Sequence, residues 1–169
     1  MDTQSRKDGL TQMNTRAESL AARVEQANND LLAAVEASTP EQWAAPCSDG
    51  EWTQGFAAYH AAAGIGLIAE RVKAVAGGEP FPMVNMAEID AENAAQAKEH
   101  GDCTQTETID LIRKSAPEAS SIVRSLTDDQ LDLKVKLMET MPEVTLENLV
   151  QMGLTGHPAY HLGTIAGAR

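Results

Sequence analysis

The longest uninterrupted pattern in the sequence lies between residues 10 and 35, where apolar side chains recur at steps of three and four. Neither proline nor glycine interrupts this stretch, whose apolar positions are Leu10, Met13, Ala17, Leu20, Val24, Ala27, Leu31 and Val35. Residues three and four apart lie on the same face of an α-helix. The pattern therefore predicts a long amphipathic helix from Leu10 to about Ser38, preceded by a frayed segment over residues 1–8.

Three later stretches have a helical pattern and start signals of their own. Thr53 is expected to cap a second helix that ends near Ala76 and is apolar almost all round, which favours deep burial. A third helix is expected to begin at a capping box that starts at Thr104, and Pro117 is expected to kink or divide this helix. Thr145 is expected to cap the last helix, which runs almost to the end of the chain. The chain therefore has four long helices.

Shorter elements are expected between these helices. Residues 39–43 predict a capped helical turn, residues 87–99 a more polar helix, and residues 127–130 another capped turn. Residues 131–137 alternate apolar and polar side chains, which predicts one short strand or half of a hairpin.

The composition favours helices over sheets as the material of the core. Hydrophobic residues make up 43% of the chain but aromatic residues only 4%. Sandwiches and barrels require more aromatic and β-branched residues than this. We therefore predict a single all-α domain over residues 1–169, a four-helix bundle with short extra helical turns and one short strand or hairpin before the last helix.

The charge and the remaining composition exclude several classes of function. A net charge of −12 repels phosphate backbones and anionic lipid, so neither nucleic-acid binding nor membrane binding is expected. The sequence has no apolar run of about 18 residues and no signal-peptide core near its start. Cys47 and Cys103 lie far apart in the sequence, and no disulfide is expected between them. A reduced, cytoplasmic setting is the expectation.

Three histidines are the candidate metal ligands. His157 and His161 are four residues apart and would lie one turn above the other on the last helix, while His60 lies in the second helix. If these helices pack together, three imidazoles can hold one divalent ion and leave coordination positions open. The alternative is that each inward-facing histidine is hydrogen-bonded to a backbone carbonyl or a hydroxyl. Spacing alone leaves both interpretations open.

The residues around the histidines indicate how the site is built. The pair belongs to an apolar stripe that is expected to be buried, formed by Leu146, Leu149, Val150, Gly153, His157, Tyr160, His161, Thr164, Ile165 and Ala168. Pro158 is expected to kink the helix next to His157 and free a carbonyl group. Gly64 and Gly66 are expected to allow close approach of a neighbouring backbone or room for a ligand. Candidates for orienting a substrate are Tyr59, Tyr160 and Thr164.

Other conspicuous residues have simpler interpretations. His100 is expected in a solvated loop, and no group near Cys47 in the sequence would lower the pKa of its thiol. Trp43 and Trp52 are expected to act as packing anchors.

Four short motifs, taken in order, resemble the DinB-like superfamily, which includes the mycothiol-dependent maleylpyruvate isomerase-like N-terminal domains. They are STPEQW at 38–43, DGEWT at 49–53, the histidine at position 60, and HPAYH at 157–161. The resemblance covers residues 38–169 and implies a four-helix bundle. Members typically hold a divalent metal with one histidine from the second helix and two ligands from the last. It therefore implies that His60, His157 and His161 are the metal ligands.

The resemblance also implies a function. Characterised relatives use the metal, commonly zinc or nickel, to hold the thiolate of a low-molecular-weight thiol during isomerisation or S-transfer; iron and manganese are alternatives here. We therefore expect a metal-dependent thiol transferase or related hydrolase that acts on a small molecule. The chain stops at Arg169, without the extra C-terminal domain of the isomerase-like subgroup, so the specific isomerase activity is not expected.

Two further expectations concern interactions and the absence of catalysis. The resemblance and the apolar surface of residues 57–67 favour a symmetric homodimer. The alternative to an enzyme is a non-catalytic bundle that binds a metal or small ligand and acts as a dimerising structural or regulatory module. An open coordination position that faces a cavity would favour the enzyme.

Overall fold

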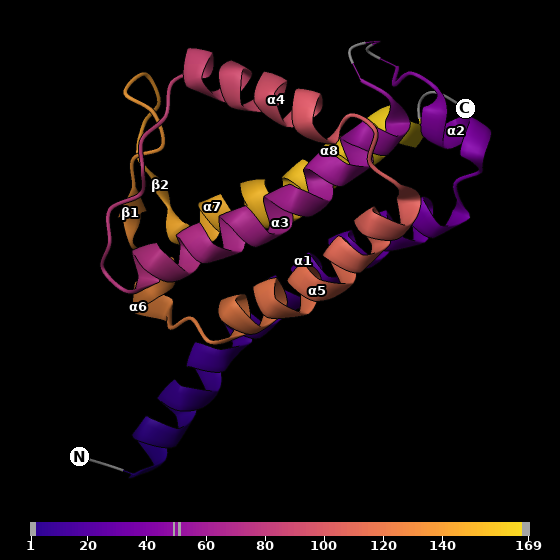
Figure 1. The fold of residues 1–169 in the computed structure, drawn as a ribbon. Coiled ribbons are helices and arrows are strands. Elements are labelled where there is room, and N and C mark those ends of the chain that lie inside the picture. Colours follow the sequence, from indigo (N-terminus) through magenta and orange to yellow (C-terminus); the bar gives the residue numbers. More distant parts are fainter. Residues whose placement is uncertain (1–2, 49, 51, 167–169) are drawn as a thin grey trace.

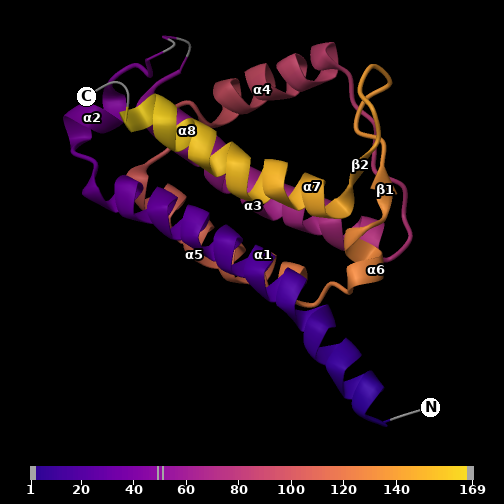
Figure 2. The ribbon, with the colours of Figure 1, turned by 180° about the vertical axis from the view of Figure 1, so that it is seen from behind.

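The computed structural model describes residues 3–48, 50 and 52–166 and shows a helix bundle (Figure 1). Its four main members are α1 (Thr3–Ala37), α3 (Gln54–Ala76), α5 (Gln105–Arg124) and a last helical stretch over residues 146–166. α1 packs against α5 and the last stretch, and α3 packs against the same two. α1 and α3 therefore occupy opposite corners of the bundle, and the view from behind shows α1 beside α5 (Figure 2).

Local sequence signals explain where most helices begin. Capping boxes at Thr39, Thr104 and Thr127 start the short α2 (Pro40–Ala44), α5 and the short α6 (Asp128–Leu131). Asn85 starts α4 (Met86–His100) in the same way, and Thr53 caps α3 with its hydroxyl. In each case a side-chain oxygen accepts a backbone N–H that the first helical turn leaves without a partner. These starts agree with the sequence expectations to within a residue or two.

The core lies where the four main helices face one another. The largest of its fully buried side chains come from every one of these helices: Leu20, Leu31, Ile65, Ile112, Leu146 and Leu154. On the surface around the core, arginine side chains form ion pairs between elements. Arg16 on α1 pairs with Asp132 at 3.0 Å and with Glu147 at 2.6 Å. In the part of the chain that the structure describes, no helix is both long and apolar enough to cross a membrane.

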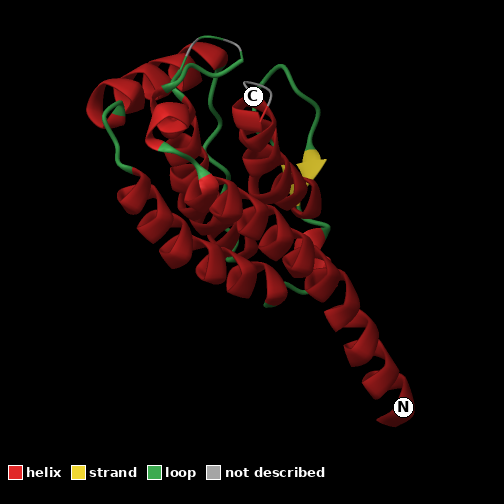
Figure 3. Cartoon of the chain, turned by 90° about the vertical axis from the view of Figure 1, so that its right-hand side faces the viewer, coloured by secondary structure: helices red, strands yellow, loops and turns green. Residues whose placement is uncertain are grey.

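The period-two stretch before the last helix forms one half of a very short hairpin. β1 (Lys134–Val135) pairs antiparallel with β2 (Val144–Thr145), so that Lys134 faces Thr145 and Val135 faces Val144. Seen from the side, the short strands, in yellow, contrast with the helices that make up most of the molecule (Figure 3). The fold prediction, a four-helix bundle with one short hairpin, is confirmed.

Two helix boundaries differ from the sequence expectations. α1 begins at Thr3 rather than near Leu10, so most of the segment expected to be frayed is helical, because extending a helix needs no new nucleus. α5 continues through Pro117 without division. Pro117 is exposed, while Ser115 and Ala119 are buried on either side of it, so packing on both sides compensates for one missing backbone hydrogen bond.

The last helical stretch is not one regular α-helix, as the sequence suggested. It consists of α7 (Leu146–Val150), a π-helical segment η1 (Gln151–Gly156) and α8 (His157–Ala166). The N–H of His157 donates to the carbonyl of Met152, five residues earlier, which is the π-helical pattern. Pro158 has no N–H to donate, and the irregularity lies immediately before it, as expected of a proline near the histidines.

Candidate metal centre

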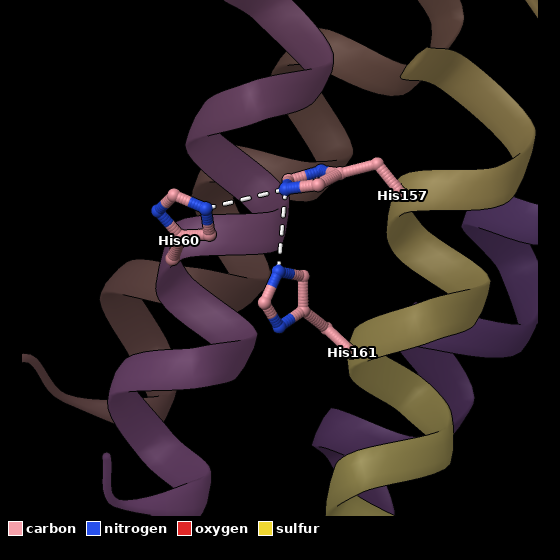
Figure 4. Close-up of side chains that lie close together, drawn as sticks. All are labelled: His60, His157 and His161. Carbon is pink, nitrogen blue, oxygen red and sulfur yellow. Dashed lines mark hydrogen bonds between the residues drawn. The ribbon is translucent and has the colours of Figure 1, made fainter. Parts of the chain in front are cut away.

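The three histidines predicted as ligands converge between α3 and α8 (Figure 4). The Nε2 atom of His157 lies 3.2 Å from Nε2 of His60 and 3.2 Å from Nε2 of His161. One nitrogen from each ring belongs to a group in which all three atoms lie within 4.8 Å of one another. The packing of the second helix against the last, which the sequence could only assume, is therefore present.

The distances fit a transition-metal ion. Zinc–nitrogen bonds of about 2.0–2.1 Å in a tetrahedral site place the nitrogen ligands roughly 3.3–3.4 Å apart. The two Nε2–Nε2 distances at His157 are close to this value. Three imidazoles suit zinc, nickel, copper or iron rather than magnesium or calcium, which prefer oxygen ligands. The donor set and these two spacings thus match a three-histidine site with at least one open position.

Gln96 on α4 fixes which nitrogen of His60 faces the centre. Its Oε1 lies 2.5 Å from Nδ1 of His60, so this nitrogen donates a proton to the amide oxygen. With the proton on Nδ1, the lone pair of Nε2 is free and directed toward the other two rings. Metal-bound histidines commonly have such a partner on the second nitrogen, because it sets the tautomer and the ring orientation.

His157 is positioned by a glycine on the facing helix. A Cβ atom at Gly64 would lie 2.9 Å from Cε1 and 3.1 Å from Nδ1 of His157, so the ring occupies the space that any larger residue would fill. Nδ1 of His157 is buried and has no hydrogen-bond partner within the described residues. The sequence analysis expected Gly64 to permit close approach of a neighbouring backbone or to leave room for a ligand; in the structure it is a side chain, the ring of His157, that approaches closely.

His161 is the most buried of the three and lies against an aromatic ring. Its side chain is 7% exposed, and the Trp52 ring lies nearly parallel to the imidazole, with the ring centroids 5.9 Å apart. Trp52 also contacts His60, with the centroids 4.9 Å apart. Trp52 thus covers one side of the centre and limits access of water.

Burial keeps the three imidazoles neutral. Loss of solvation is the main cause that lowers the pKa of His157 to about 4 and that of His161 to about 3, and each is lowered further by the neighbouring histidines. The pKa of His60 is also lowered by burial, although its hydrogen bond to Gln96 opposes the shift. Metal ligation needs the neutral ring, so the site is ready for an ion at neutral pH.

The lowered pKa values predict that the metal-free protein loses stability in acid. Unfolded histidine has a pKa of about 6.5, so between about pH 6.5 and 4 the unfolded chain binds more protons than the folded one. The free energy of unfolding should therefore decrease as the pH falls through this range. Urea unfolding of metal-free protein at several pH values measures it. In a variant that carries both His157→Gln and His161→Gln, the free energy of unfolding should change less with pH between about pH 6.5 and 4. An equal pH dependence in the variant and the wild type would contradict the prediction.

A cavity of about 560 Å³ adjoins the three histidines. Its wall also includes Trp52, Arg71, Glu92 and Tyr160 among mostly apolar side chains from α3, α4, the hairpin region and the last helical stretch. The volume suits a small organic molecule. The candidate metal centre therefore faces a cavity, which is what the enzyme interpretation requires.

The other predicted site residues divide between this cavity and another face of α3. Thr164 and Tyr160 line the cavity, but Tyr160 is 63% exposed rather than buried as the stripe suggested. Tyr59 faces away and lies against His100, with the ring centroids 4.7 Å apart and the ring planes tilted by 31°. The helical turn explains this, because adjacent residues such as Tyr59 and His60 point about 100° apart. Ala168 lies outside the described residues.

Two residues at the centre were not assigned to it from the sequence. Trp52, expected only to pack, precedes the cap of α3, and its contacts with both helices could not be inferred from periodicity. Gln96 lies in a polar helix without a distinctive motif. Trp43, by contrast, is the expected packing anchor, since its Nε1 donates to the carbonyl of Cys103 at 3.0 Å. Cys47 lines the cavity, and no disulfide joins it to Cys103.

Comparisons with known proteins agree with this architecture. A solved structure described as YfiT from Bacillus subtilis, "a probable metal-dependent hydrolase with an unusual four-helix bundle topology", matches with a TM-score of 0.71 and 20% sequence identity. The match covers 90% of this chain and 85% of that one. A comparison with curated proteins found no match. The family model of the DinB superfamily matches residues 23–165, and the chain therefore belongs to the DinB superfamily.

Proposed function

We propose that this protein is a metal-dependent enzyme in which His60, His157 and His161 hold one divalent ion, zinc or nickel. The observation that carries the proposal is the convergence of three neutral imidazoles beside a cavity of about 560 Å³. When bound, such an ion lowers the pKa of a coordinated thiol or water and so supplies a nucleophile at neutral pH.

The protein's own residues would prepare the site for this chemistry. Gln96 holds the proton of His60 on Nδ1, and Gly64 leaves room for the ring of His157. Trp52 packs on His161 and shields one side of the centre from water. The apolar cavity would bind the acceptor molecule beside the nucleophile and remove its water, which strengthens the electrostatic interactions.

Transfer of a low-molecular-weight thiol is the reaction we favour. Hydrolysis by a metal-bound water is commonly assisted by a general base within hydrogen-bonding distance of that water. Within the described residues, Glu92 is the only carboxylate that lines the cavity, and none is hydrogen-bonded to the three histidines. A thiolate held by the ion needs no base in the transfer step. The hydrolytic alternative is favoured by the description of the YfiT structure, which shares the fold.

The experiment that tests the proposal compares the two nucleophiles on one preparation. Metal-free protein, purified without a histidine tag, is reloaded with zinc or nickel. It is then assayed with low-molecular-weight thiols, including mycothiol, and an apolar electrophile, and in parallel with p-nitrophenyl esters. We expect turnover that needs both metal and thiol and that disappears in His161→Ala. Metal-dependent ester hydrolysis without thiol would show that the protein is a hydrolase and not a thiol transferase. Turnover that does not depend on metal would contradict both proposed activities.

We also propose that the protein forms a homodimer in the cytoplasm. Large apolar side chains remain exposed near the cavity, including Leu67 at 52% and Met152 at 47%. A two-fold contact is the commonest way to bury such residues. Because each chain has a net charge of −12, association should weaken at low salt.

Sedimentation measures the dimer directly. At micromolar concentration and moderate ionic strength we expect a species of twice the mass of the chain. A single species near 18.0 kDa under these conditions would contradict the proposal. Leu67→Gln should shift the equilibrium toward the monomer, while Lys114→Gln, which changes an exposed charged residue on another helix, should leave it unchanged.

A further inference from the structure

Arg71 is the only arginine or lysine among the described residues that line the cavity. It lies on α3, eleven residues after His60, and therefore three helical turns further along nearly the same face. The separation along the helix axis is about 16 Å at 1.5 Å per residue. The cavity wall thus has the candidate metal centre at one position and a fixed positive charge well away from it.

Arg71 has no anionic partner within the described part of the chain. Its guanidinium carbon lies 5.4 Å from the centroid of the Phe81 ring, and no described residue forms an ion pair or hydrogen bond with it. Arg16, Arg113 and Arg124, by contrast, each contact carboxylates on other elements. Arg71 thus lacks a carboxylate partner although the chain has 25 acidic residues, and a half-buried guanidinium without such a partner can bind the anionic group of a ligand that enters the cavity.

Glu92 is the other charged residue of the wall and does not neutralise Arg71. It lies on α4, is exposed, and forms no ion pair with Arg71. Water and salt screen an exposed charge more strongly than a half-buried one. The electrostatic field that acts on a ligand bound beside Phe81 therefore comes mainly from Arg71.

Apart from Arg71, Glu92 and the histidines, the cavity wall is mostly apolar. It includes Ile68, Val84, Ile89, Leu137, Leu149 and Met152. The chain after α3 and the chain after β1 meet on this wall, where the N–H of Val84 donates to the carbonyl of Leu137 at 3.2 Å. A ligand that reaches Arg71 from the histidines therefore crosses an apolar surface and meets a cation.

We propose that the substrate of this cavity is an elongated acid with an apolar middle, whose carboxylate binds Arg71 and whose reacting group lies at the histidines. This inference rests on the proposed function, because it names the substrate class for that site. His60 and Arg71 both lean toward the N-terminus of α3, but the arginine side chain is the longer and reaches further in that direction, so the ligand needs somewhat less than the axial separation, a length on the order of 10 Å. A planar guanidinium can hold both oxygens of one carboxylate.

Calorimetric titration of the metal-free protein with octanoate and octanol tests the proposal. The two probes have the same length and the same kind of apolar chain, but octanoate ends in a negatively charged carboxylate and octanol in a neutral hydroxyl. Wild-type protein should bind octanoate at least about tenfold more tightly than octanol. Arg71→Met keeps an unbranched side chain beside Phe81 and should remove this preference, while Arg71→Lys should retain most of it. Lys73→Gln, which removes an exposed positive charge from the same helix, is the matched control and should bind like the wild type.

Separate measurements distinguish failure of this inference from failure of the metal site. Arg71→Met should bind zinc like the wild type, and His157→Gln should lose zinc binding but keep octanoate binding. Octanoate binding that is equal in wild type and Arg71→Met, or no tighter than that of octanol, would overturn the proposal. Binding of octanoate only in the presence of zinc would also overturn it, because the carboxylate would then occupy the ion rather than Arg71.

Discussion

Replacing His161 by alanine should lower the affinity for zinc and nickel by at least about 100-fold while the protein remains folded. Changes to residues that merely support a metal ligand already lower affinity about 10–100-fold, and loss of a direct ligand should cost at least as much. The fold should survive because the core is formed by four helices and does not depend on an ion, unlike a zinc finger. Titration with metal, together with circular dichroism, measures both effects.

His100→Ala is the matched control for this variant. His100 ends α4 and its ring lies against Tyr59, on a face of α3 away from the cavity, so its loss should leave metal affinity unchanged. Unchanged affinity in His161→Ala would remove this residue from the ligand set. Complete unfolding of His161→Ala would instead assign it a structural role.

Gly64→Ala should weaken metal binding by about tenfold or more, although alanine favours helices. In a helix interior this substitution normally stabilises by about 1 kcal/mol. Here the new Cβ would lie 2.9 Å from Cε1 of His157, and the ring must move away from the position in which it faces His60. Ligands need to be held within about 0.5 Å of their productive position, so a displaced ring binds the ion poorly. Metal titration of the variant measures the loss.

Gly66→Ala separates this local effect from any general effect on α3. A Cβ at Gly66 would meet Ser115 Cβ at 3.6 Å, which is an ordinary contact. This variant should keep its metal affinity and gain up to about 1 kcal/mol in the free energy of unfolding. Equal metal affinity in the two variants would contradict the role assigned to Gly64.

The parts of the fold that depend on local chemistry were predictable from the sequence. Thr39, Thr104 and Thr127 form their capping boxes with residues three positions away, so no knowledge of the distant chain is needed. The face shared by His157 and His161 follows from helical geometry in the same way. The position of His60 beside them depends on how α3 packs, which only the resemblance to other proteins indicated.

Features that depend on packing or on helix register were not predictable. The π-helical segment before His157 changes the number of residues per turn, and the sequence shows only Pro158 as a sign of irregularity. Tyr160 belongs to the apolar stripe but is exposed at the cavity, which depends on how the described helices pack around it. Gln96 on α4 contacts His60 on the preceding helix, and this contact depends on how the two helices pack rather than on any local signal.

Elemental analysis of the protein, purified without a histidine tag and dialysed against micromolar zinc and then against metal-free buffer, tests the central claim most directly. We expect one equivalent of zinc per chain in the wild type and in His100→Ala. We expect none in a variant in which His60, His157 and His161 are all replaced by glutamine. A wild-type protein that retains no more zinc than this triple variant would contradict the assignment of His60, His157 and His161 as metal ligands.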